Sequence, residues 1–243
     1  MENPSYKVYC LCYNNPIREQ EIKEQFKQVG LLSTQYVIFP GVGPTDSRLC
    51  DYDCSFIQMT PQLSRVWSIT YGHLDMIQMF LQSNDEYGIM CEDDLVIHRE
   101  FSTKIPGVAE FMKTSETNLV MLSYLMACPT VSGIPDYHEI QPHYFTYPDD
   151  LWGTQMYMVS RFGAKQILDK YASNPMYPID TYDTYPFGAD WTITKCPFLE
   201  KALISPMLAI EDGKRSYEHY GHPGQYSLHN QTFHANYIEN EFI

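Results

Sequence analysis

Three consecutive carboxylates, Glu92, Asp93 and Asp94, are the side chains of this sequence best suited to chemistry. They interrupt an apolar run: segment 87–97 reads YGIMCEDDLVI, and a short buried strand is expected before the charges. Adjacent anions repel one another, and charged side chains are seldom buried unless they are paired or bind a metal. Carboxylate oxygens are ligands for Mg²⁺ and Mn²⁺, the hard cations that hold diphosphates. The cluster therefore indicates a cation site; a solvated acidic turn is the alternative.

A second group of candidate binding side chains lies in the tail that starts at residue 211. Lys214 and Arg215 form a basic pair in an otherwise acidic protein, and such side chains can meet a phosphate. Either His219 or His222 could complete the coordination of a metal already held by carboxylates. Glycine, charge and histidine together are typical of a loop that closes over an anionic ligand, although an ordinary solvated tail has the same composition. The histidines of the tail are His219, His222, His229 and His234.

A third candidate is Asp190, in segment 187–191, which reads FGADW. A carboxylate beside Trp191 could act as a general base in a pocket lined by an aromatic ring. An aspartate at a helix start is also a common N-cap, which is the structural alternative. Asp180 and Asp183, in the loop before it, are further carboxylates that could serve as the base.

These side chains need a sheet whose strand ends meet at one edge. The patterns of 7–13, 17–29 and 35–39 predict a strand, a helix and a strand, which suggests a parallel pair. A helix from Thr60 to about Gln82 would carry His73 on its apolar side, where we interpret it as a hydrogen-bonded core residue. The strand that leads into the three carboxylates would then end at the edge where parallel sheets bind ligands. Further strands are expected at 119–125, 154–159 and 202–210, and further helices at 102–113, 161–171 and 189–195. An irregular hairpin is expected at 131–147 and a loop at 174–187.

Composition limits the class of protein and its partners. The 243 residues are 44% hydrophobic and 19% charged, which fits a single α/β domain with a true core. The net charge of −14 argues against DNA, RNA or anionic membranes as partners. No apolar run is long enough to span a membrane, and the N-terminus lacks the pattern of a signal peptide. Together with seven cysteines, an odd number that fits free thiols, this predicts a cytoplasmic protein, with a bacterial or viral origin compatible.

Three stretches carry residue patterns that follow one another along the chain: Tyr87–Ile97, Leu151–Gln155 (LWGTQ) leading to Ser160-Arg161-x-Gly163-Ala164, and Ala189-Asp190-Trp191. Taken in order, they resemble glycosyltransferase family 25, which includes bacterial lipooligosaccharide sugar transferases and collagen galactosyltransferases. Arg18 in the opening turn and His73-Leu74 match more weakly, and Gly72 stands where the family usually has serine. The tail is not matched closely, so a histidine ligand there rests on analogy with the fold. The resemblance runs from about residue 8 to about residue 210.

The resemblance implies a GT-A-like fold: a mixed sheet flanked by helices, in a single domain. Residues of about 1–125 would bind the nucleotide sugar, about 126–210 would bind the acceptor, and 211–243 would form a tail or lid. It also implies transfer of a sugar from a UDP-sugar to a hydroxyl of a glycan or glycoprotein, with inversion at the anomeric carbon. In this reading Mn²⁺ (or Mg²⁺) is bound by Asp94 with Asp93 or Glu92, and Asp190 is the base. The other implied contacts are Asn14, Arg18, Glu92, Asp93, Lys214 and Arg215 to the nucleotide sugar, Trp152 and Trp191 to the acceptor, and His219 and His222 to the metal.

Two other functions fit parts of the sequence. A non-catalytic carbohydrate-binding protein would use its aromatic side chains on glycans and the acidic cluster for a structural Ca²⁺. A metal-dependent phosphoesterase ranks lowest, because such enzymes usually spread histidines and aspartates over several strand ends. The sequence leaves the sugar, the acceptor and the oligomeric state open.

Overall fold

The computed structural model describes residues 4–50, 60–126, 143–146, 151–172, 188–194, 196, 198–212 and 223–243. Its strands are β1 (Tyr6–Leu11), β2 (Tyr36–Phe39), β3 (Tyr87–Glu92), β4 (Leu95–Ile97), β5 (Leu119–Met126), β6 (His143–Thr146), β7 (Leu151–Ser160), β8 (Lys201–Ser205) and β9 (Ala209–Glu211). Seven of them form one mixed sheet in the order β2-β1-β3-β7-β5-β8-β6, and β4 pairs with β9 beside it.

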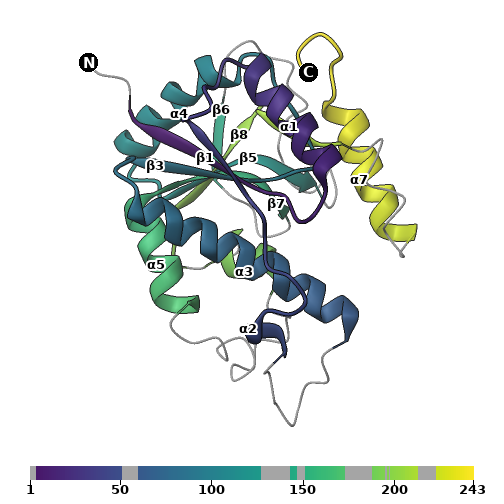
Figure 1. Cartoon of the computed structure of the whole chain (residues 1–243). Helices are drawn as coiled ribbons and strands as arrows, with labels where there is room; N and C mark the ends of the chain where they lie inside the picture. The colour runs from purple at the N-terminus through teal and green to yellow at the C-terminus, as the bar shows by residue number, and fades with distance from the viewer. Residues whose placement is uncertain are drawn as a thin grey trace.

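Helices cover both faces of the seven-stranded sheet (Figure 1). Helices α1 and α4 lie on one face, and α3 and α5 lie on the other, so the expected mixed α/β sheet flanked by helices is confirmed. The bounds are α1 (Pro16–Gln28), α2 (Ser47–Cys50), α3 (Pro61–Gln82), α4 (Phe101–Thr114), α5 (Arg161–Tyr171), a short π-helical segment η1 (Asp190–Thr194) and α7 (Pro223–Asn236).

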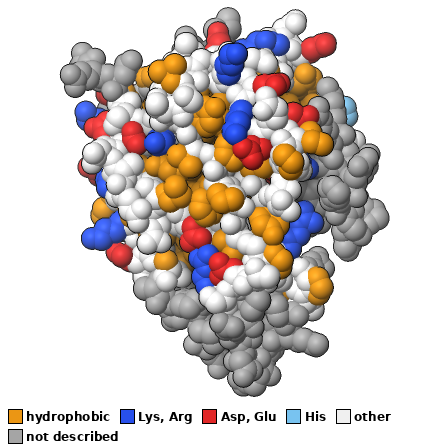
Figure 2. All heavy atoms as spheres, in the orientation of Figure 1, with side chains coloured by type: hydrophobic (Ala, Val, Ile, Leu, Met, Phe, Trp, Pro, Cys, Tyr) orange, Lys and Arg blue, Asp and Glu red, His pale blue; other side chains and the backbone are white. Residues whose placement is uncertain are grey.

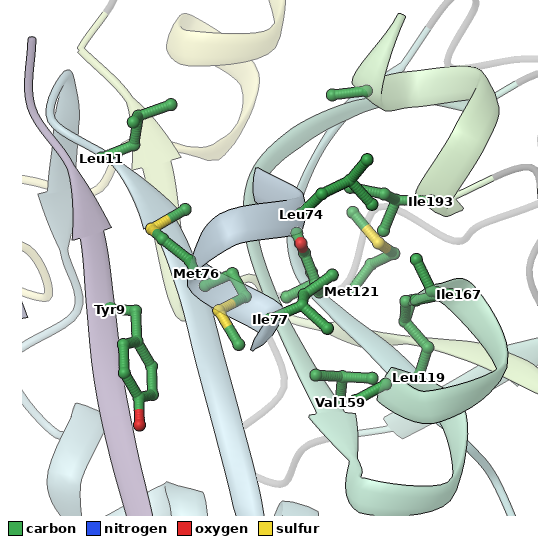
Figure 3. Packing of buried hydrophobic residues seen from close by; sticks show 14 of the residues in the cluster. Tyr9, Leu11, Leu74, Met76, Ile77, Leu119, Met121, Val159, Ile167 and Ile193 are labelled. Carbon is green, nitrogen blue, oxygen red and sulfur yellow. The ribbon is translucent and has the colours of Figure 1, made fainter. Parts of the chain in front are cut away.

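Each face of the sheet has its own hydrophobic core because successive side chains of a strand point to opposite faces. Val8 and Cys10 of β1 join the core beneath α1 and α4, whereas Tyr9 and Leu11 join the core beneath α3 and α5. Figure 3 shows the second of these cores, where Leu74, Met76 and Ile77 of α3 lie between β1 and the strands that carry Leu119, Met121 and Val159. Burial on both faces explains why the central strands read as nearly continuous apolar runs.

Helix boundaries follow the capping signals of the sequence. Thr60 caps α3 by accepting a hydrogen bond from the backbone N–H of Leu63 at 3.1 Å, and Ser160 caps α5 through Gly163 at the same distance. Helix α3 packs close to β1 at Gly72: a Cβ there would lie 2.8 Å from Leu11 Cδ1, so any side chain at this position would require Leu11 to move.

Three elements differ from the sequence-based expectation. The single strand expected at 202–210 is two strands, β8 and β9, separated by a break that contains Pro206, which has no N–H to donate. The polar tail contains a helix, α7. The strand expected at 154–159 begins three residues earlier, which brings Gly153 into the sheet.

On the described part of the face in Figure 2, acidic and basic side chains lie next to one another with hydrophobic side chains between them. No helix among the described residues is long and apolar enough to cross a membrane.

Candidate functional site

Five strand ends meet at one edge of the sheet. β1 and β3 are parallel, with Leu11 opposite Glu92 at their carboxyl ends. β7 runs antiparallel to β3 and to β5, so its first residues, beginning at Leu151, lie at this same edge beside the end of β5. β8 is parallel to β5 and ends here as well. The edge where ligands were expected is therefore the edge that carries the three carboxylates.

Arg18 is the positive charge at the acidic turn. Its Nη1 lies 3.1 Å from Asp93 Oδ1 and 3.6 Å from Asp94 Oδ2. The guanidinium is in reach because Asn15 caps α1, its Oδ1 accepting from the backbone N–H of Arg18 at 3.2 Å. Asn14 precedes this cap with a φ of 48° and lies in the same turn. The opening turn and the acidic turn, 75 residues apart in sequence, thus form one polar surface.

Glu92 lies in a pocket of hydrogen-bonding side chains. Thr154 Oγ1 donates to Glu92 Oε1 at 3.0 Å, and Nε2 of the fully buried His73 lies 3.5 Å from the same oxygen. Nδ1 of His73 is 3.1 Å from the hydroxyl of Tyr157, so a neutral imidazole that presents Nε2–H to Glu92 would accept from the tyrosine. Burial works to raise the pKa of Glu92, but His73 and Thr154 lower it below its ordinary value. The prediction that His73 is a hydrogen-bonded core residue is confirmed.

Asp94 has surroundings of the opposite kind. Burial raises the pKa of Asp94 well above its ordinary value, and the charges of Glu211 and Glu92 raise it further, against the smaller effect of Arg18. Glu211 comes close because β4 and β9 pair, and the backbone N–H of Asp212 donates to Asp94 O at 2.6 Å. Asp94 Oδ1 is buried and has no hydrogen-bond partner within the described parts of the chain. Asp94 therefore has Arg18 near one oxygen, Oδ2, and no donor to the other oxygen among the described residues.

Glu211 is itself only 5% exposed and is bound by two side chains. Gln155 Nε2 donates to Glu211 Oε2 at 3.3 Å, and His229 Nδ1 lies 2.5 Å from the same oxygen. His229 belongs to α7, so the tail contributes to the site through a helix.

A bulge in β7 distributes its residues among the carboxylates. Ser123 and Leu125 of β5 pair with Met156 and Trp152, so two steps along β5 match four steps along β7. Extra residues in a bulge re-aim their side chains. The result is three donors to three carboxylates: the backbone N–H of Gly153 to Asp190 Oδ1 at 2.7 Å, Thr154 to Glu92, and Gln155 to Glu211.

The acidic turn offers carboxylate oxygens, the type of ligand that hard cations prefer. Within the residues that the structure describes, no three side chains of His, Cys, Asp or Glu form a ready cluster for a metal ion. The oxygens nonetheless have the right chemistry, because Asp94 Oδ1 is a buried acceptor without a donor and repels its neighbour Glu211. Asp94 and its acidic neighbours therefore fit Mg²⁺ or Mn²⁺ in type of ligand.

Several expected site residues lie outside the described parts of the chain: Lys214, Arg215, His219, His222 and the side chain of Trp191. Trp152 is half-buried on β7, opposite Leu125. Cys12 lies beside Asp93, and burial with a hydrogen bond to Asp93 raises the pKa of this thiol to about 12. Cys12 therefore stays protonated near neutral pH and is no candidate nucleophile.

Sequence reasoning did not assign roles to Thr154, Gln155, Glu211 and His229. A signal existed for the first two, because they are polar residues within a strand that is otherwise apolar. Glu211 and His229 come together only through the pairing of β9 with β4 and the packing of α7. No local sequence pattern indicates that these two residues meet.

Among known proteins, similarity to this chain is found in solved structures. No protein-family model and no curated protein matches the chain. A solved structure that is similar is that of a glycosyltransferase involved in the glycosylation of the major capsid of PBCV-1. It has 9% sequence identity and a TM-score of 0.41, over 80% of this chain and 76% of that one. This likeness concerns the outline of the fold and does not extend to individual side chains.

Proposed function

We propose that the protein is a divalent-cation-dependent glycosyltransferase with a GT-A-like fold. It would move a sugar from a UDP-sugar to a hydroxyl of a glycan or glycoprotein, as the resemblance to family 25 implies. The observation that carries the proposal is Asp94: a carboxylate at the ligand edge of the sheet, raised in pKa and next to Glu211, with a buried oxygen that has no donor among the described residues. Such an arrangement destabilises the protein when no ligand is bound, and a bound cation would relieve the repulsion.

The donor would bind along the acidic turn. Asp94, with Asp93 or Glu92, would hold Mn²⁺ or Mg²⁺, which when bound neutralises the charge that develops on the leaving UDP. Arg18 contacts Asp93 and Asp94 now and is long enough to pair with a phosphate oxygen as well. Its position supports a role in binding the diphosphate.

The acceptor would react on the opposite face of the sugar. As the acceptor oxygen forms its bond to the anomeric carbon and the bond to UDP breaks, the hydroxyl proton passes to the carboxylate of Asp190. Displacement from the opposite face inverts the configuration. The backbone N–H of Gly153 donates to Asp190 Oδ1 at 2.7 Å and so orients this carboxylate.

Release of UDP from a panel of UDP-sugars tests the proposal. The wild type should release UDP with Mn²⁺ present, and Asp94→Asn should reduce the rate about 100-fold or more because a cation ligand is lost. Asp85→Asn is the matched control: it makes the same change before β3, and the rate should be unchanged. Full turnover by Asp94→Asn with Mn²⁺ would contradict the proposal.

A further inference from the structure

Gln155 has an amide whose orientation is fixed by its neighbour. The side chain is 6% exposed, and its Nε2 donates to Glu211 Oε2 at 3.3 Å. The flipped orientation would put the amide oxygen against a carboxylate, which would repel it. Oε1 is therefore the atom that points away from Glu211, and it is buried without a hydrogen-bond partner among the described residues.

Gly153 leaves the space that this oxygen occupies. Its φ is 117°, and a Cβ built on it would lie 2.0 Å from Gln155 Oε1. A side chain at position 153 would displace the amide, because no rearrangement short of moving Gln155 relieves so close a contact. The bulge thus holds a glycine where only a glycine leaves the amide oxygen in place.

Two buried oxygens at this edge of the sheet lack a hydrogen-bond donor among the described residues. Asp94 Oδ1, like Gln155 Oε1, has no donor within the described structure. A buried acceptor without a partner costs about 1–3 kcal/mol. Glu211 lies between Gln155 and Asp94. It accepts a hydrogen bond from the Gln155 amide, and the pairing of β4 with β9 brings it next to Asp94. Two carboxylates and an amide oxygen are the kinds of ligand that bind hard divalent cations.

We propose that Gln155 Oε1 and Glu211 are ligands of the divalent cation together with Asp94, and that His229 holds Glu211 in position. The inference rests on the proposed function and revises its ligand set, in which Asp93 or Glu92 accompanied Asp94, by adding an amide and a carboxylate. It explains why no cluster of His, Cys, Asp and Glu alone is found in the described chain, since one ligand is a glutamine. His229 acts as a positioning residue at 2.5 Å from Glu211 Oε2.

Mn²⁺ binding, followed by the electron paramagnetic resonance signal of free Mn²⁺ with UDP present, tests the ligand set without relying on turnover. Gln155→Met keeps the length of the side chain and removes the oxygen, so Mn²⁺ should bind about 10-fold more weakly or worse. Gln155→Glu restores an oxygen but cannot donate to Glu211, and it should bind within about 3-fold of the wild type. Gln166→Met is the matched control, because Gln166 on α5 also has a buried Oε1 without a hydrogen-bond partner among the described residues. Its affinity should not change.

The outcomes separate the two proposals. Unchanged affinity in Gln155→Met overturns the ligand role of Gln155. If Gln155→Glu is as weak as Gln155→Met, the amide N–H that holds Glu211 is what matters, and the ligand role is again wrong. If Gln155→Met does not fold, Glu211→Gln should weaken Mn²⁺ about 10-fold, and wild-type affinity in that variant overturns the inference. A wild type that binds no Mn²⁺ removes the proposed function as well.

Discussion

Glu92 and Asp94 stand two positions apart at the end of β3, and their surroundings act on a negative charge in opposite ways. Glu92 is met by a threonine hydroxyl and by a buried histidine, and its pKa is lowered. Asp94 is half-buried beside Glu211, and its pKa is raised. The scaffold thus gives Glu92 a hydrogen-bond donor, whereas Asp94 has Arg18 near one oxygen and the like charge of Glu211 beside it.

The difference follows from the elements on each side of the turn. Thr154 and His73 reach Glu92 from the central strand β7 and the long helix α3, which belong to the rigid core. Asp94 faces β9, whose last residue is Glu211. Groups whose environments push their pKa values apart commonly have different roles in a site. Here Glu92 fits the role of a constant hydrogen-bond acceptor, and Asp94 fits the role of a cation ligand.

A third carboxylate, Asp190, extends the comparison and carries the largest expected effect. Its Oδ1 accepts a hydrogen bond from the backbone N–H of Gly153 at 2.7 Å, so the bulge in β7 orients it. Its hydrogen-bond donor differs from that of Glu92. As the general base, it should affect transfer alone: Asp190→Asn should reduce transfer to an acceptor by about 10²–10⁴-fold. Calorimetry should show UDP binding with Mn²⁺ as in the wild type. Unchanged transfer, or UDP binding lost in parallel, would contradict its role as the base.

Melting temperatures of the cation-free protein test the contrast between Glu92 and Asp94 directly, with a smaller effect. Because the folded-state pKa of Asp94 is raised, stability is lost as pH rises from its ordinary pKa of 3.8 through the folded value. Asp94→Asn should therefore melt higher than the wild type at pH 7.5, and the difference should vanish at about pH 4 and below. The folded-state pKa of Glu92 is lowered, so its contribution is present above 4.5 and is lost as pH falls through the folded value.

Glu92→Gln should accordingly melt lower than the wild type at pH 7.5. Each kcal/mol corresponds to about 2–4 °C in a protein of this size. Addition of Mn²⁺ should raise the melting temperature of the wild type and leave that of Asp94→Asn nearly unchanged. Equal destabilisation by both substitutions at pH 7.5 would show that the two environments do not differ.

The sequence predicted the elements that local patterns encode. The cap at Thr60, the apolar stripe that follows it and the strand before Glu92 appear as expected, because each signal lies within one element. The helix α7 was missed because its sequence, PGQYSLHNQTFHAN, has few apolar residues at helical spacing. Its contact with Glu211 depends on tertiary packing.

The candidate site was predicted in part for the same reason. The carboxylates themselves form a local cluster, so the acidic turn and its position at a strand end could be read from the sequence. The contacts of Thr154 and Gln155 depend on a bulge and on the insertion of β7 between β3 and β5, which no local pattern states. The opposite environments of Glu92 and Asp94 are a product of that topology.

Calorimetric titration of UDP into the wild-type protein, once with Mn²⁺ and once with a chelator, is the most direct test of the cation-dependent nucleotide site. UDP should bind at least about 10-fold more tightly with Mn²⁺, a difference of about 1.4 kcal/mol, because the cation neutralises Asp94 and Glu211 as it meets the diphosphate. Equal affinity in the two titrations, or no binding of UDP in either, would contradict it.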